Sequence, residues 1–148
     1  MLVSEILRIK GHTLFTTPPE RSVLEAVDVM AENDIGSLVV MDRGRLAGIL
    51  TFAEVLRALA DRRGSLGDVA VADILTSDPL TATPGLDVMD LRRTMLERHA
   101  RYVPVMDGTT LLGVVSFHDV AKAVLEEQTF ENRMLKSYIK DWPDEASA

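Results

Sequence analysis

The chain contains two copies of one sequence unit, and this repetition restricts its fold more than any other feature. A shift of 65 residues aligns Thr16–Val55 with Thr81–Val120 without a gap. Twelve of the 40 aligned pairs are identical, whereas ordinary composition gives roughly two or three by chance. A unit of this size cannot bury an apolar face alone, so the repeat predicts two similar halves packed together.

The offset between the copies changes upstream of this repeat. Val3–Leu7 matches Val71–Leu75 at a shift of 68, so the first copy carries three extra residues near Gly11–Leu14. The segment Gly64–Gly67 is the expected linker. We therefore expect a first motif at residues 1–63, a linker at 64–67, a second motif at 68–125, and a helical extension with a frayed tail at 126–148.

The sequence of each copy predicts a short helix, a brief extended piece and then a longer helix. Pro19 and Pro84 interrupt the chain after the extended piece, as proline does at element boundaries. Ser22 and Asp87 are good helix N-caps, and apolar residues at helical spacing follow each of them, which favours a helix.

Two apolar runs separated by a polar connector come next in each copy, a pattern that is typical of a β-hairpin. A further helix is expected from Thr51 or Ser116. The predicted fold class is α/β (α+β): two β-α-β-β-α motifs packed sheet to sheet with pseudo-twofold symmetry, one cleft for each copy, and a long C-terminal helix. The apolar runs are Ser37–Met41, Leu46–Leu50, Tyr102–Met106 and Leu111–Val115.

The composition weighs against several classes of protein. There are 23 acidic residues against 16 basic ones, for a net charge of −7, which weighs against nucleic-acid and anionic-membrane partners. The absence of cysteine excludes disulfides and thiolate metal sites, and the three histidines lack metal-ligand spacing. No apolar run approaches the ~20 residues of a membrane span, and the first residues lack the apolar stretch of a signal peptide, so we expect a cytoplasmic protein without a metal.

Three short motifs occur in a fixed order along the repeat. Thr-x-x-Pro begins at Thr16 and Thr81, and the second copy continues with Tyr102–Asp107 and Gly113–Asp119. The chain therefore resembles the tandem cystathionine β-synthase (CBS) domain pair of the stand-alone bacterial regulatory type. The resemblance implies a non-catalytic regulatory module that pairs into a disc-shaped homodimer. Its implied ligand contains adenosine: AMP, ADP, ATP, NAD or S-adenosylmethionine.

The second copy carries the favoured candidate site. Ser116 begins a helix, whose free N–H groups and partial positive charge suit a phosphate. The two oxygens of Asp119 match the vicinal hydroxyls of a ribose, and Tyr102–Pro104 is expected to form an apolar wall for adenine. The candidate nucleotide-binding residues here are Thr81, Arg101, Tyr102, Val103, Pro104, Ser116, His118 and Asp119.

The first copy departs from this pattern. Glu54 replaces the aspartate, and Gly36 and Ser37 stand where the second copy has Arg101 and Tyr102. We expect this cleft to be empty, weaker, or specific for another ligand. Its candidate residues are Thr16, Gly36, Ser37, Leu38, Thr51 and Glu54.

A purely structural role stays open for both acidic pairs. Ser116-x-x-Asp119 and Thr51-x-x-Glu54 are also capping-box patterns, which satisfy free helix N–H groups without any ligand. A ligand-free dimerisation or adaptor module is therefore the alternative function. Its working surface would be an apolar stripe on the C-terminal helix, which we expect to pack on the disc or on a partner chain. The stripe comprises Met134, Leu135, Tyr138, Ile139 and Trp142.

Overall fold

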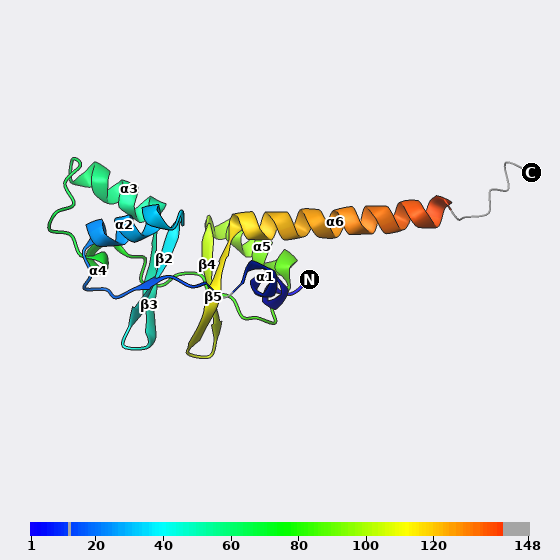
Figure 1. Cartoon of the computed structure of the whole chain (residues 1–148), viewed down its shortest axis with the longest axis horizontal. Helices are drawn as coiled ribbons and strands as arrows, with labels where there is room; N and C mark the ends of the chain where they lie inside the picture. The colour runs from blue at the N-terminus through cyan, green and yellow to red at the C-terminus, as the bar shows by residue number, and fades with distance from the viewer. Residues whose placement is uncertain (12, 141–148) are drawn as a thin grey trace, which may run out of the picture.

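The computed structural model describes residues 1–11 and 13–140, and it confirms the repeated order of elements (Figure 1). The first half contains α1 (Val3–Lys10), β1 (Thr16–Thr17), α2 (Val23–Glu32), β2 (Ser37–Asp42), β3 (Arg45–Thr51) and α3 (Phe52–Asp61). The second half contains α4 (Val71–Ile74), α5 (Val88–Arg98), β4 (Tyr102–Asp107), β5 (Thr110–Ser116) and α6 (Phe117–Lys140).

The predicted N-caps of the two longer helices are confirmed. The side chain of Ser22 accepts a hydrogen bond from the Glu25 N–H at the start of α2. The side chain of Asp87 accepts one from the Met89 N–H at the start of α5. Each bond satisfies a backbone donor that has no partner within its helix.

Two β-hairpins lie side by side at the centre of the molecule, and the helices flank them (Figure 1). The predicted hairpins are confirmed: Val40 pairs with Gly48 in the first, and Val105 pairs with Gly113 in the second. Both ladders shift register immediately after these pairs, so the copies share even this irregularity. β1 adds a parallel strand beside β2, and a single parallel bridge from Ala82 to Val105 takes its place in the second half.

The short helix ahead of each half packs on the opposite half. Val3 and Ile6 of α1 belong to the buried core of the second half, whereas Val71 of α4 belongs to that of the first. The backbone joins the same elements, because the Val3 N–H donates to Leu86 O at 2.9 Å and the Val71 N–H donates to Arg21 O at 2.8 Å. A division of the chain near residue 64 therefore separates each short helix from the core that it covers.

The predicted long C-terminal helix is confirmed as far as Lys140. Its first turns bury Val120 and Val124 against the second half, and the remainder projects beyond the body (Figure 1). Of the two alternatives expected for its apolar stripe, packing on the disc is wrong for the part that the structure describes, and packing on a partner chain stays a prediction. Trp142 and Asp144–Ala148 lie outside the described residues. The stripe residues Met134, Leu135, Tyr138 and Ile139 are 56–62% exposed.

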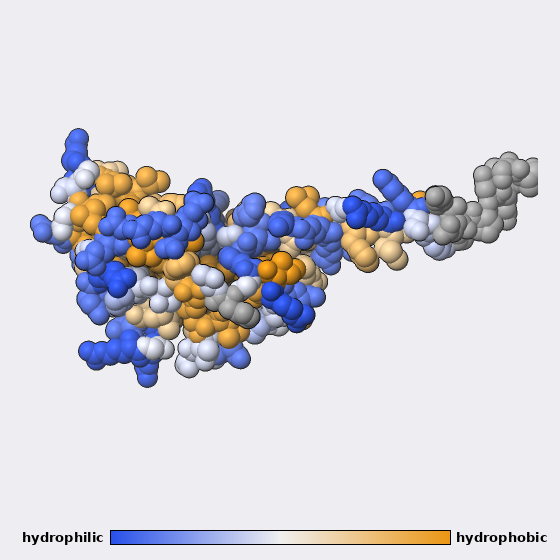
Figure 2. Space-filling model, viewed as in Figure 1, coloured by the Kyte–Doolittle hydropathy of each residue, from blue (hydrophilic) through white to orange (hydrophobic). Residues whose placement is uncertain are grey.

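Polar side chains cover much of the projecting helix, with apolar ones between them, whereas more continuous apolar surface lies over the body (Figure 2). Within residues 1–11 and 13–140, no helix combines the length and hydropathy needed to cross a membrane.

Candidate functional site

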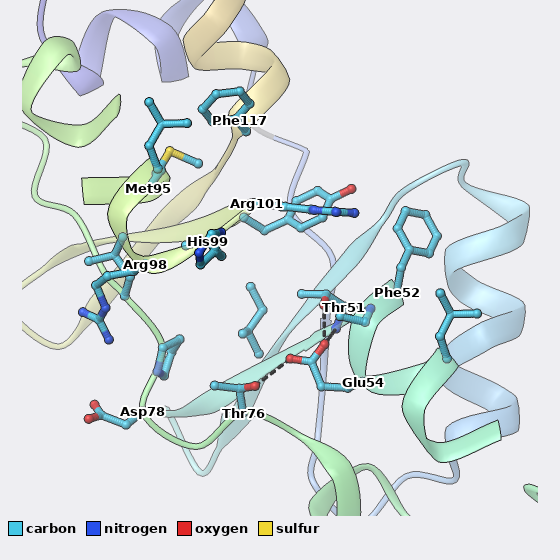
Figure 3. A pocket seen from close by; sticks show the side chains of 18 residues that line it. Thr51, Phe52, Glu54, Thr76, Asp78, Met95, Arg98, His99, Arg101 and Phe117 are labelled. Carbon is cyan, nitrogen blue, oxygen red and sulfur yellow. Dashed lines mark hydrogen bonds between the residues drawn. The ribbon is translucent and has the colours of Figure 1, made fainter. Parts of the chain in front are cut away.

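A cleft of about 690 Å³ lies between the two halves (Figure 3). This volume is within the range of about 300–1,000 Å³ that small-molecule sites occupy. The first half contributes the end of β3 and the start of α3, and the second contributes the end of α5 and the start of β4. The connector after α4 completes the lining with Thr76, Asp78, Pro79 and Leu80.

The carboxylate of Glu54 accepts hydrogen bonds at both of its oxygens. Oε2 accepts the Thr51 N–H at 3.1 Å and also the Thr51 hydroxyl. Oε1 accepts the hydroxyl of Thr76 at 2.6 Å, so the connector is bonded to the start of α3 on the same wall of the cleft (Figure 3). The predicted capping box is thus present, and in addition each oxygen already receives one hydroxyl donor. A ribose diol would present the same pair of donors.

The opposite wall of the cleft is basic. α5 ends at Arg98, and His99 adopts a left-handed conformation with φ of 53°, which turns the chain toward β4. This turn places two guanidinium groups and one imidazole on the lining, opposite Glu54 (Figure 3). The residues are Arg98, His99 and Arg101. Arg98 also lies at a helix C-terminus, where a cation is electrostatically favourable.

Aromatic rings from both halves meet at the edge of this cleft. The rings of Phe52 and Tyr102 are 6.5 Å apart at an interplanar angle of 66°, an edge-to-face contact. Burial raises the pKa of the Tyr102 phenol, and the nearby Asp119 carboxylate raises it further, against an opposing effect of Arg101. The phenol is therefore protonated at neutral pH and can donate a hydrogen bond.

The corresponding carboxylate of the second half has a different partner. Asp119 Oδ2 accepts the Ser116 N–H at 2.9 Å, and the Asp119 N–H donates to Ser116 Oγ at 3.0 Å. The Lys10 ammonium then donates to the same Oδ2 at 2.8 Å and to Val114 O at 2.9 Å. Burial favours a raised pKa for Asp119, but the hydrogen bonds from Lys10 and Ser116 outweigh it and lower that pKa.

The structure regroups the residues that the sequence assigned to separate sites. One cleft contains Thr51 and Glu54 from the first candidate set together with Arg101 and Tyr102 from the second. The motifs of each copy are contiguous in sequence, which led us to assign each cleft to one copy. The halves face each other instead, so a cleft takes one wall from each.

The remaining candidates lie in the core or outside the lining of this cleft. Leu38, Val103 and Pro104 are buried in strands. Pro104 O is not free for a ligand, because it accepts the Ala82 N–H at 2.9 Å. Three candidates are exposed and lie outside this lining: Thr16, Thr81 and His118. Gly36 lies against the Tyr102 phenol. Ser37 pairs with Thr51 in the ladder between β2 and β3.

Two contributors were missed by sequence reasoning. Thr76 follows α4 and Lys10 is the last residue of α1, and each contacts the acidic residue of the opposite half. Nothing in local periodicity reveals that exchange. A usable signal was the three-residue insertion after α1, which shows that the two connectors differ.

The repeated hairpins, the exchanged helices and the cleft between the halves define a two-motif α/β module. Comparison with known sequences then shows that the chain belongs to the CBS domain family, whose profile matches residues 3–61 and 71–126. It is 31% identical over 148 residues to the mitochondrial CBS domain-containing protein CBSX3 of Arabidopsis thaliana, covering 93% of this chain and 71% of that protein.

Solved structures share the fold. The CBS-domain protein ATU1752 from Agrobacterium tumefaciens superposes with a TM-score of 0.79 at 28% identity, covering 83% of this chain and 98% of that one. The CBS domain pair of protein MJ0100, crystallised with 5′-methylthioadenosine and S-adenosyl-L-methionine, gives a TM-score of 0.76 at 25% identity, covering 86% and 98%. Arabinose 5-phosphate isomerase KdsD of Yersinia pestis is 30% identical to this chain over 122 residues. The alignment covers 82% of this chain and 37% of that enzyme.

Proposed function

We propose that the chain is a regulatory sensor that binds an adenine nucleotide in the cleft between its halves. The observation that carries the proposal is the Glu54 carboxylate, which accepts two hydroxyl donors and faces a basic wall. The adenosine ligands of the MJ0100 pair support the same ligand class.

The proposed pose assigns one part of the nucleotide to each part of the cleft. The ribose hydroxyls replace the hydroxyls of Thr51 and Thr76 at the Glu54 carboxylate, and the phosphates face Arg98 and Arg101. Guanidinium groups bind phosphate oxygens through charge-assisted, often bidentate, hydrogen bonds. The base lies against apolar lining residues such as Leu80.

Signalling follows from the position of the cleft. Because its walls belong to different halves, a ligand that bonds to both walls favours the arrangement that brings them together. A ligand shifts such an equilibrium by its difference in affinity for the two states. The protein acts in this way by binding alone, without a chemical step. We further propose that it works as a homodimer in the cytoplasm.

Isothermal titration calorimetry tests the proposal with AMP, ADP, ATP, NAD and S-adenosylmethionine. We expect at least one of them to bind to the wild-type protein, and Glu54→Ala to weaken that binding at least about tenfold, the loss of about 1.4 kcal/mol. Loss of the cap alone costs about 1 kcal/mol of stability, so the variant should remain folded. Glu126→Ala, an exposed glutamate on α6, is the matched control. If none of the five ligands binds to the folded protein, the proposal is overturned.

One observation favours a second candidate, an adaptor that works through α6. Phe130, Met134, Leu135 and Ile139 are 56–64% exposed on the projecting part of this helix, and exposed apolar surface often marks an interaction site. Under this candidate both acidic pairs serve as caps. Truncation of α6 separates the two functions, because the adaptor needs the projecting helix and the sensor does not.

A further inference from the structure

The two halves hold their equivalent carboxylates with different chemistry. Glu54 and Asp119 occupy the same position of the repeat, and each is contacted from the exchanged helix region: Glu54 by the connector after α4, and Asp119 by the last residue of α1. At Glu54 the contact is the neutral Thr76 hydroxyl at 2.6 Å, whereas at Asp119 it is the Lys10 ammonium at 2.8 Å. The two copies therefore differ at the atoms that would meet a sugar.

The different lengths of the two short helices explain this asymmetry. α4 ends at Ile74, and the chain then pairs with β3, where Thr76 and Ile49 exchange backbone hydrogen bonds at 3.0 Å in both directions. α1 has eight residues against four in α4, so it continues for another turn. That extra turn carries Lys10 past Leu7 to the start of α6.

Lys10 is held firmly in this position. Its ammonium bonds to both Asp119 and Val114 O, which fixes two of its three donors. Its helix is anchored by Val3 and Ile6, which are 0% and 5% exposed in the second-half core. The ammonium therefore forms part of the wall.

A ribose would have to displace an ammonium at Asp119. The ammonium of Lys10 forms an ion pair with this carboxylate, and a sugar hydroxyl carries no charge to replace that Coulombic attraction, so the exchange of Lys10 for sugar hydroxyls is unfavourable. At Glu54 the same exchange replaces one neutral hydroxyl donor with another, and little is lost.

The first half also lacks the basic residues that form the wall opposite Glu54. Alignment of the copies places Asn33, Asp34 and Gly36 where the second half has Arg98, His99 and Arg101. By the repeat, these residues correspond to the basic wall, as Ser116 and Asp119 correspond to Thr51 and Glu54. A phosphate there would meet a carboxylate in place of two guanidinium groups.

We propose that Lys10 excludes nucleotides from the Ser116–Asp119 position of the second half, so that one chain binds a single nucleotide, in the cleft of Glu54. This inference rests on the proposed function for the occupied cleft. It assigns Lys10 the role of a gate residue, which determines how many ligands the pair accepts.

Calorimetric stoichiometry tests the gate, with AMP, ATP and S-adenosylmethionine as probes. Lys10→Met removes the ammonium and keeps an unbranched apolar chain of the same length as the four-carbon stem of lysine. We expect one site per chain in the wild type, two in Lys10→Met, and one again in Lys10→Met combined with Asp119→Ala. Lys122→Met, which removes an exposed lysine of α6, is the matched control and should retain one site.

The outcomes separate the gate from the proposed function. Two sites in the wild type, or one site in both the wild type and Lys10→Met, overturn the gate. No site in the wild type but one in Lys10→Met that Asp119→Ala removes would support the gate and overturn nucleotide binding at Glu54. No site in either protein overturns both. Circular dichroism confirms that each variant is folded, and Lys10→Gln serves as a second variant.

Discussion

The phenol of Tyr102 occupies the space that a side chain at Gly36 would need. A β-carbon at position 36 would lie 1.9 Å from Tyr102 Oη and 2.4 Å from Cε2 of Phe52. Gly36 belongs to the first half and Tyr102 to the second, so this contact joins the halves beside the cleft. The glycine is needed here for close packing, because its φ is not among the positive values of the chain.

Gly36→Ala is therefore expected to destabilise the protein by about 1–3 kcal/mol, the usual cost of overpacking. Urea unfolding of the variant measures the effect. Gly85→Ala is the matched control, because no atom lies within 4 Å of its added methyl group and its φ is not positive. We expect the control to change stability by less than about 0.5 kcal/mol.

A double-mutant cycle tests whether Tyr102 causes this cost. Tyr102→Ala relieves much of the overlap, so the double variant should be more stable than the sum of the single effects predicts, by about 0.5–3 kcal/mol. Strict additivity would show that the strain arises elsewhere.

The sequence predicted the elements well because each one depends on local pattern. Hairpins, N-caps and the long helix follow from alternation, capping residues and the absence of proline before Pro143. The exchange of α1 and α4 depends on which core each apolar face meets. Val3 and Val71 are both apolar and at helical spacing, and nothing in that pattern distinguishes one core from the other.

The candidate site was predictable in its residue types but not in its grouping. Thr51 and Glu54 lie three residues apart in the sequence, and Arg101 and Tyr102 are neighbours. Both pairs were identified from the sequence as candidate binding residues. Their meeting in one cleft depends on the packing of the halves. Lys10 was not identified, since a lysine at the end of a helix is ordinary and its contact with Asp119 spans 109 residues of sequence.

The basic wall predicts a ligand that carries phosphate. We expect Arg101→Gln to weaken ATP binding about tenfold, the size of one lost charge-assisted hydrogen bond, and to leave adenosine binding unchanged. Calorimetry with both ligands measures the two effects. Arg92→Gln, an exposed arginine of α5 outside the cleft lining, is the control and should alter neither. Equal losses for ATP and adenosine would mean that Arg101 supports the cleft without contacting phosphate.

The Lys10–Asp119 ion pair predicts a specific pH dependence of stability. The pKa of Asp119 in the folded protein is lowered below its ordinary value of 3.8, so the unfolded chain takes up this proton more readily than the folded one. The stabilisation is therefore present above about pH 4, and it is lost as the pH decreases through the folded pKa.

Thermal unfolding of wild-type and Lys10→Met protein measures the contribution of this ion pair to stability. We expect the wild type to melt at a higher temperature at pH 7, and the difference to shrink steadily below about pH 4. Lys122→Met should show no such trend. A difference that is constant across the acid range would assign the effect of Lys10 to packing of its aliphatic stem rather than to its charge.

Truncation after Glu127 decides between the sensor and the adaptor. The apolar side chains removed from the described part of α6 are exposed, Phe130 at 64% and Leu135 at 56% among them, so the body loses little buried surface. We expect the melting temperature to change by less than about 4 °C, which corresponds to about 1 kcal/mol for a chain of this size. The nucleotide affinity should stay within about twofold, because the Glu54 cleft is formed without these residues.

Light scattering after size exclusion then reports the oligomeric state of the truncated protein. Unchanged nucleotide binding with loss of the dimer would assign α6 to assembly and the cleft to sensing, whereas loss of a partner in a protein that binds no nucleotide would support the adaptor alone.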